Sequence, residues 1–300
     1  MKNIFIYKIN DIKFLKCVNL LILPYLQLSR LDRSVGIFFV LFPYISVLIK
    51  LNNGFPKIYQ IILVLFVSFI MRSIGCTVND ICDRNFDNKI ERTYTRPISI
   101  KKLNLYKSWN FLFFQLLICL FIINIINLFN KFFSISIFVL TIIYPTIKRL
   151  TNFPQIFLGF IFNSGIFLLC LEFFGNLNYI LLVIWFCKIL WQVGYDSVYS
   201  YIDLKDDIYV GVYSISSKIL DNGKFFISVL YSISIILFCI FGLLSNMNFT
   251  YHICITSIFL NFAWQIFILK LRNQNTNFIV FNSNKMISLL FLIAILFGTF

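Results

Sequence analysis

The sequence predicts an all-α membrane protein with about nine transmembrane helices, and three observations support this. Of the 300 residues, 60% are hydrophobic and 13% are charged, whereas a soluble domain carries about 25% charged residues. Apolar runs long enough to cross a hydrocarbon core of roughly 30 Å recur along the chain. Lysine and arginine gather in alternate connections, as is typical of segments that stay in the cytoplasm.

The predicted spans lie near residues 34–50, 58–79, 108–127, 132–147, 154–173, 178–198, 224–245, 249–269 and 285–300. With the N-terminus in the cytoplasm, 21 of the 26 lysine and arginine residues fall on the cytoplasmic side, which favours that orientation. We expect a single domain over 1–300, with an interfacial N-terminal segment at 1–33. Two cytoplasmic cap loops are expected at 80–107 and 199–223.

Composition also argues against several kinds of site. The net charge of +14 follows the predicted topology, so no nucleic-acid partner is expected. The eight cysteines form no Cys-x-x-Cys pair, and the single histidine, His252, lies near the predicted outer surface. A zinc site or a histidine-based triad is therefore not expected, and no feature indicates an obligate protein partner.

A first polar stretch follows the second span. Asn79, Asp83 and Asp87 are spaced at i, i+4 and i+8, so on a helix they share one face. Three such oxygen-bearing side chains, two of them anionic, repel one another unless a cation lies among them. Hard oxygen ligands suit Mg²⁺, although a solvated helix end is the open alternative.

A second polar stretch follows the sixth span. Asp196, Tyr199, Asp203 and Asp207 are spaced at i, i+3, i+7 and i+11, again on one helical face. The two stretches hold eight of the 12 acidic residues of the chain. This concentration in a basic protein predicts two halves of one metal–polyphosphate site on the cytoplasmic side.

Basic residues flank both stretches. Arg72 lies within a span, where a charge is a functional hypothesis by default, and it is seven residues before Asn79; snorkelling to the interface is the alternative. Arg92 and Arg96 are four apart and are suited to gripping a phosphate or carboxylate. Lys188 is eight residues before Asp196, and we expect it to be a counter-ion to the acidic site.

Four segments resemble, in order, the motifs of the UbiA family of membrane prenyltransferases. The N-terminal signature is Arg30-Leu31-Asp32-Arg33-x-x-Gly36, and the intervening segment is Tyr144-Pro145-x-x-Lys148-Arg149 with Pro154-Gln155-x-x-x-Gly159. The first motif is Met71-Arg72-x-x-Gly75-Cys76-x-x-Asn79-Asp80-x-x-Asp83-Arg84-x-x-Asp87, with Arg92-Thr93-x-x-Arg96-Pro97. The second is Tyr195-Asp196-x-x-Tyr199-x-x-x-Asp203-x-x-Asp206-Asp207-x-x-x-Gly211.

The likeness covers residues 25 to 220, with three departures. Family members usually have Pro in place of Ser34, Ser-Gly in place of Ile100-Lys101, and Lys in place of Tyr213. The last change removes a cation near the expected diphosphate position, which Lys205 or Lys218 would have to replace. Every acidic position of the motifs is kept.

The intervening segment resembles the branch that acts on 4-hydroxybenzoate. The resemblance implies transfer of a polyprenyl group from polyprenyl diphosphate to the ring carbon ortho to the hydroxyl, with release of diphosphate, in ubiquinone biosynthesis. It implies Mg²⁺ held by Asn79, Asp83, Asp87, Asp203 and Asp207. The isoprenoid tail would leave sideways into membrane lipid.

Further roles are implied for individual residues. Asp196 is a candidate to orient or deprotonate the phenol, with diphosphate as the alternative proton acceptor, and Arg72, Lys148 or Arg149 would hold the carboxylate. The catalytic set is Asp83, Asp87, Asp196, Asp203 and Asp207. The substrate-binding set is Arg30, Arg72, Asn79, Arg84, Arg92, Arg96, Lys148, Arg149, Tyr199 and Lys218.

Alternatives stay open. Within the family, the acceptor could be naphthoate, homogentisate, haem or a lipid alcohol. A cation-coupled transporter is the rival from another class, but it should show related repeats and polar groups near the membrane midplane. Because the chain begins close to the domain without a transit peptide, we expect a multi-pass protein of the bacterial inner membrane, with the mitochondrial inner membrane as the alternative.

Overall fold

The computed structural model describes residues 19–32, 35–88, 90, 93–126, 128–175, 177–211 and 213–300. Arg33, Ser34 and Arg92 therefore lie outside the described residues, as does the N-terminal segment up to residue 18. The described part contains helices, turns and connecting segments and no strand, which confirms the predicted fold class.

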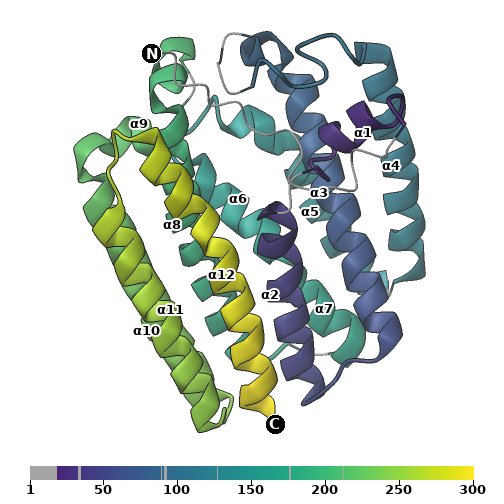
Figure 1. Ribbon diagram of the computed structural model, residues 1–300. Coiled ribbons are helices and arrows are strands. Elements are labelled where there is room, and N and C mark those ends of the chain that lie inside the picture. The colour runs from purple at the N-terminus through teal and green to yellow at the C-terminus, as the bar shows by residue number, and fades with distance from the viewer. Residues whose placement is uncertain are drawn as a thin grey trace.

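The described helices pack side by side in a bundle, and the C-terminal end of α12 lies at the bottom of the view (Figure 1). Their bounds are α1 (Leu23–Leu28), α2 (Val35–Asn52), α3 (Ile58–Asp87), α4 (Leu105–Ile125), α5 (Leu128–Ile147), α6 (Pro154–Asn163), α7 (Gly165–Phe174), α8 (Tyr179–Val210), α9 (Ile215–Ile219), the 3₁₀ turn η2 (Leu220–Asn222), α10 (Gly223–Leu244), α11 (Phe249–Ile268) and α12 (Gln274–Thr299).

Eight segments of the described chain are long and apolar enough to cross a membrane, with α6 and α7 counted together. The remaining predicted span corresponds to α2, whose apolar part, Phe38–Asn52, is shorter. The predicted span 154–173 is divided at Ser164 into two helices, α6 and α7. There the Tyr44 hydroxyl of α2 donates to the Phe162 carbonyl, which supplies a partner to a backbone group near the break.

Three helices extend beyond the predicted span ends. We expected the second span to end near 79 and the sixth near 198, but α3 continues to Asp87 and α8 to Val210, while α12 begins at Gln274 rather than 285. Polar side chains lower hydropathy without breaking backbone hydrogen bonds, so α8 ends only at Gly211, which takes the left-handed conformation. The residues expected in the two caps therefore begin as helix.

The length of these helices places the acidic residues outside the apolar layer. α3 has 30 residues, so at 1.5 Å per residue it is about 45 Å long, against a hydrocarbon core of roughly 30 Å. α8 has 32 residues, which gives about 48 Å. Both helices therefore carry their polar C-terminal turns past the membrane core.

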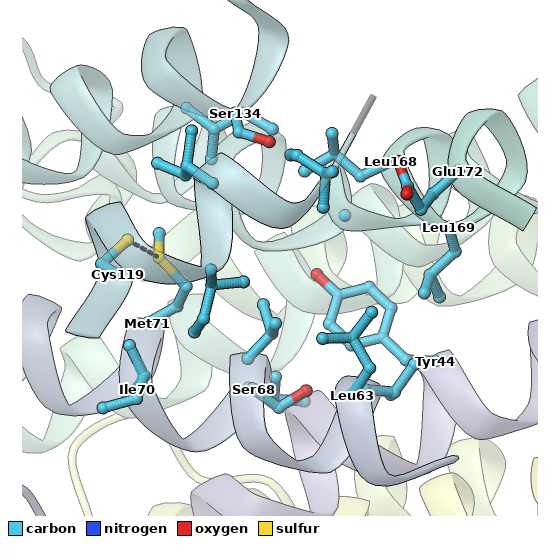
Figure 2. A pocket seen from close by; sticks show the side chains of 18 of the residues that line it. Tyr44, Leu63, Ser68, Ile70, Met71, Cys119, Ser134, Leu168, Leu169 and Glu172 are labelled. Atoms are coloured by element: carbon cyan, nitrogen blue, oxygen red, sulfur yellow. Dashed lines mark hydrogen bonds between the residues drawn. The ribbon is translucent and has the colours of Figure 1, made fainter. Parts of the chain in front are cut away.

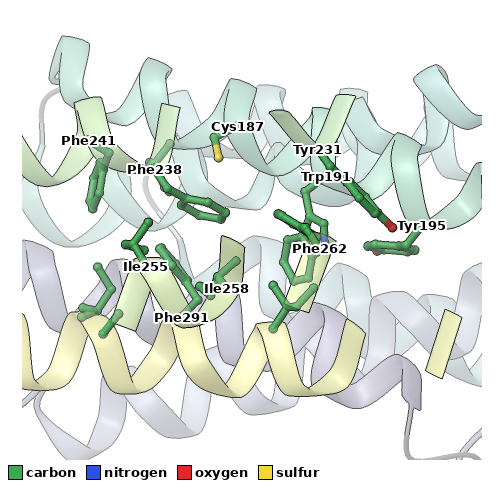
Figure 3. Packing of buried hydrophobic residues seen from close by; sticks show 14 of the residues in the cluster. Cys187, Trp191, Tyr195, Tyr231, Phe238, Phe241, Ile255, Ile258, Phe262 and Phe291 are labelled. Carbon is green, nitrogen blue, oxygen red and sulfur yellow. The ribbon is translucent and has the colours of Figure 1, made fainter. Parts of the chain in front are cut away.

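The main core joins α8, α10, α11 and α12 and extends to α2. Aromatic side chains interlock across it, with Tyr231 stacked on Phe262 at 4.1 Å and Phe238 against Phe291 at 5.0 Å between ring centroids (Figure 3). A hydrogen bond of 2.8 Å from Trp191 Nε1 to Asn284 Oδ1 joins α8 to α12. α8 is the most enclosed candidate span, so it can hold polar side chains away from lipid.

Candidate active site

Asn79 and Asp83 lie one turn apart on α3 and face the C-terminal end of α5. Lys148, just after that end, donates from Nζ to Asn79 Oδ1 and, over 3.2 Å, to Asp83 Oδ2. Arg149 approaches Asp83 Oδ1 at 3.5 Å and lies over the Phe86 ring. Two of the three residues predicted to share a face, Asn79 and Asp83, therefore contact the same cation, Lys148.

Asp80 and Asp87 of α3 turn toward a different pair of cations. Arg96 Nη1 donates to both Asp87 oxygens, at 2.9 and 2.8 Å, and lies 3.0 Å from Asp80 Oδ1. Arg30 Nη2 donates to the same Asp80 oxygen over 2.7 Å. Burial lowers the pKa of Arg30, but the Asp80 carboxylate and weaker neighbours raise it above its usual value overall, so the guanidinium stays charged.

The acidic stretch of α8 approaches the same region from the other side. Asp203 is buried, and it interacts electrostatically with Asp196, which in turn interacts with Lys148. Tyr199 interacts electrostatically with Arg30. Lys148 and Arg30 thus each interact with residues of both acidic stretches.

A cavity of about 300 Å³ lies at this meeting point. Its wall comes from α1, α2, α3, residues 95–97, α6, α8 and α12, and it includes Arg30, Arg72, Arg96, Asp196 and Tyr199. Aromatic rings line one side, where Phe39 stacks on Tyr195 at 4.4 Å between centroids and Tyr199 packs on Phe281 at 4.6 Å. The cavity therefore combines three guanidiniums, the carboxylates of Asp32 and Asp196, and aromatic faces.

A second cavity of about 180 Å³ lies deeper between α2, α3, α4, α5, α6 and α7. Its lining is predominantly apolar, with Met71 and Cys119 on one side and Tyr44 and Leu169 on the other (Figure 2). Val40, Arg72 and Phe162 line both cavities. Arg72 therefore stands at the junction between a polar compartment and an apolar one.

Several motif residues hold the segments around the site. Pro154 and Gln155 begin α6, and Gln155 Oε1 accepts from the Ile215 amide at the start of α9. The Tyr213 amide donates to the Lys148 carbonyl over 3.2 Å. The segment after α8 is thus fixed to the segment that carries Lys148, and the Tyr213 side chain is exposed.

Not every residue singled out from the sequence faces the cavities. Arg84 Nη1 donates to the Ile81 carbonyl of its own helix, Lys218 is exposed in α9, and neither lines either cavity. Lys188 is not the expected counter-ion, because its ammonium is buried in the α8–α12 core, 4.2 Å from the Trp191 ring centroid. Side chains eight residues apart on an α-helix differ by about 80° in direction around the helix axis, so Lys188 and Asp196 have different neighbours.

Sequence reasoning missed a buried polar pair beside the site. Asn163 Nδ2 of α6 donates to Gln192 Oε1 of α8 over 2.8 Å, and Gln192 lines the polar cavity. Both are single amides in a chain rich in asparagine, so neither stood out. The signal for Gln192 was its position four residues before Asp196, on the same helical face.

The residues present fit a hard cation such as Mg²⁺, provided that substrate completes its shell. Asn79 and Asp83 offer converging oxygen atoms, whereas no three carboxylate, thiol or imidazole groups of the described residues are placed to hold a metal ion together. Mg²⁺ is usually bound by one or two carboxylates together with water and substrate phosphate. The arrangement suits that mode and not a closed protein metal centre.

Comparison with known proteins decides the family. The model of the UbiA prenyltransferase family matches residues 40–295. The chain belongs to the UbiA prenyltransferase family. This confirms the resemblance predicted from the four motifs.

Two curated relatives share most of this chain. The 4-hydroxybenzoate octaprenyltransferase of Histophilus somni is 31% identical over 281 residues, which are 92% of this chain and 97% of that protein. The mitochondrial 4-hydroxybenzoate polyprenyltransferase of Dictyostelium discoideum is 32% identical over 277 residues, 91% of this chain but 60% of that longer protein.

Solved structures share the fold. An apo UbiA homologue from Aeropyrum pernix K1 aligns with a TM-score of 0.74 at 20% identity, over 87% of this chain and 96% of that one. A UbiA homologue from Archaeoglobus fulgidus, bound to GPP and Mg²⁺, aligns with a TM-score of 0.70 at 14% identity, over 91% and 99%.

Proposed function

We propose that the protein transfers a polyprenyl group from polyprenyl diphosphate to the carbon ortho to the hydroxyl of 4-hydroxybenzoate, releasing diphosphate, in ubiquinone biosynthesis. The observation that carries this is the junction at Arg72 between a cavity of about 300 Å³ and an apolar one of about 180 Å³. One compartment suits anionic groups, and the other suits the first units of an isoprenoid. The names of the curated relatives support the same pair of substrates.

For the donor, we place the diphosphate near the ends of α3 and α8, between Lys148, Arg30 and Arg96. Asn79, Asp83, Asp203 and Asp207 would hold Mg²⁺ there, and the metal would neutralise charge on the leaving diphosphate. The Mg²⁺ reported with the Archaeoglobus fulgidus homologue supports this choice of metal. The tail would enter the apolar cavity and, beyond its volume, pass sideways into lipid.

For the acceptor, Arg72 is the candidate for binding the benzoate carboxylate. Its Nε is buried and has no hydrogen-bond partner among the described residues, so it has a donor to offer. The ring would lie among Phe39, Tyr195 and Tyr199, with its hydroxyl toward Asp196. Arg149 is a weaker candidate because its side chain is 44% exposed and directed to Asp83.

The chemistry then follows from these positions. The donor's carbon–oxygen bond breaks, the diphosphate takes the electron pair, and the allylic carbocation faces aromatic rings that stabilise positive charge. The phenol ring carbon supplies electrons to the new carbon–carbon bond. Loss of the ring proton, to Asp196 or to diphosphate, restores aromaticity.

The cellular setting follows the same proposal. We place the chain as a single domain in an inner membrane, bacterial or mitochondrial, with its N-terminus in the cytoplasm or matrix. The polar segments within 80–107 and 199–223 would cover the site as cytoplasmic caps, and the N-terminal segment 1–33 would be interfacial. One of the two curated relatives is a bacterial protein, and the name of the other describes it as mitochondrial, which supports either membrane.

Prenyl transfer in membranes that contain the expressed chain tests the proposal. The assay supplies 4-hydroxybenzoate and a polyprenyl diphosphate with Mg²⁺ or with EDTA, beside Asp83→Ala and Asp203→Ala. We expect Mg²⁺-dependent prenylated 4-hydroxybenzoate that both variants abolish. Well-folded protein that gives no product with this acceptor would overturn the substrate assignment, and naphthoate, homogentisate and haem would be assayed next.

A further inference from the structure

The asparagine and aspartate side chains near the C-terminal end of α3 divide into two sets that contact different cations. Asn79 and Asp83 bond Lys148, whereas Asp80 and Asp87 bond Arg30 and Arg96. Asp80 and Asp87 are seven residues apart, so they too lie on one helical face, two turns from each other. The helical spacing allows Asp87 to be grouped either with Asn79 and Asp83 or with Asp80. The contacts with Arg96 place Asp87 with Asp80.

Among the described residues, ion pairs join the second set into a cluster of four charges. The side chains of Asp80 and Asp87 are 1% and 5% exposed, and those of Arg30 and Arg96 are 12% and 14% exposed. Two carboxylates face two guanidiniums, and the nearby carboxylate of Asp32 also interacts electrostatically with Arg30. Buried charges with well-placed partners resist rearrangement, because separating them leaves each one unpaired.

Asp87 also anchors the chain that carries Arg96. Its carbonyl accepts from the Thr93 hydroxyl over 3.1 Å and from the Ile90 amide over 3.4 Å. The amides of Thr93 and Arg96 are in turn bonded to the carbonyls of Ile90 and Thr93. Side chain and backbone of Asp87 therefore fix the segment 93–97 to the end of α3.

The two arginines line the polar cavity, but Asp80 and Asp87 are not among its lining residues. We infer that Asp80 and Asp87 are positioning residues that hold Arg30 and Arg96 at the cavity wall, and that Asp87 is not a metal ligand. This removes Asp87 from the metal and catalytic sets predicted from the sequence. The consequence for substrate rests on the proposed function, because the anion that the two guanidiniums meet is the substrate's.

Amide hydrogen exchange in metal-free protein tests this inference without reference to activity. The full chain in EDTA is compared with Asp87→Asn, with Asp83→Asn as the matched change one turn earlier, and with Arg96→Gln. We expect exchange in the peptide spanning 93–97 to be about tenfold faster in Asp87→Asn and Arg96→Gln, because the opening equilibrium of a segment sets its exchange. Asp83→Asn should exchange as the native protein does.

Addition of Mg²⁺ with inorganic diphosphate separates the two roles. If Asp87 is a positioning residue, Asp87→Asn needs the same Mg²⁺ concentration as the native protein for half-maximal protection of the site from exchange. Asp83→Asn is expected to need a higher Mg²⁺ concentration. The inference is overturned if Asp87→Asn shifts that concentration as Asp83→Asn does, or if Arg96→Gln leaves the 93–97 peptide unchanged in EDTA. Failure of prenyl transfer alone would count against the proposed function and leave these exchange results standing. Arg96→Gln keeps the Asp87 carboxylate, so it decides the matter even where Asp87→Asn fails to fold.

Discussion

The guanidinium of Arg72 lies directly against the face of Gly36. A Cβ atom added to Gly36 would stand 1.2 Å from Nη1 and 1.9 Å from Cζ of Arg72. The backbone at the start of α2 can therefore contact the Arg72 guanidinium of α3 this closely only because position 36 has no side chain. This contact fixes where Arg72 meets the two cavities.

Gly36→Ala is expected to displace Arg72 and to lower kcat/KM for 4-hydroxybenzoate by about 10²-fold, since a shift near 1 Å in a positioning group has that effect. Steady-state kinetics at saturating donor measure it. Gly75→Ala on α3 is the matched control, because its Cβ would meet Thr141 at an ordinary 3.5 Å. Equal losses in both variants would contradict a specific role for the Gly36–Arg72 contact.

Lys148 and Arg149 are adjacent but are expected to differ in effect. Lys148→Gln removes a partly buried ammonium that bonds Asn79 and Asp83, so we expect kcat/KM for the donor to fall by roughly 10- to 100-fold, the range for a hydrogen bond to a charged group. Arg149→Gln removes a more exposed pair and should cost less than about fivefold. Donor titrations of both variants check this, and the reverse order would count against the placement of the diphosphate.

Filling the apolar cavity should select among donors by tail length. Ser134 of α5 lines this cavity, so Ser134→Phe is expected to raise KM several-fold for a long-tailed donor and to change it little for a short one. Ile135→Phe is the neighbouring control, because Ile135 is 44% exposed and faces outward. Competition between a short and a long prenyl diphosphate measures the ratio. An unchanged ratio in Ser134→Phe would remove the tail from this cavity.

Lys188→Met is expected to retain activity. Lys188 is 1% exposed, and its ammonium has no hydrogen-bond partner in the described structure, while the rings of Trp191 and Phe291 supply cation–π contact. A methionine of similar length avoids the desolvation, so stability should be unchanged or raised by up to about 2 kcal/mol. Thermal unfolding and prenyl transfer are measured together, with Lys148→Met as the comparison whose activity is expected to fall. Loss of activity in folded Lys188→Met would restore a role for Lys188 at the site.

The sequence predicted the kinds of element and the family more securely than the partners of single side chains. Hydropathy located the spans because burial in lipid requires long apolar runs, yet it placed the ends of α3 and α8 too early, since a helix continues through polar residues. Helical spacing placed Asn79 with Asp83, and both meet Lys148. The same spacing placed Lys188 with Asp196, and that prediction was wrong.

What the sequence determined by itself was the set of charges and their order along the chain: few acidic residues, gathered in two stretches, in a chain otherwise apolar. The tertiary structure alone decided which charge meets which. Asp87 has neighbours at i−4 and i−7 that are both acidic, and periodicity cannot choose between them. Arg96 and Arg30 reach α3 from separate segments, so their contacts depend on how those segments pack, and long-range packing leaves no local signal in the sequence.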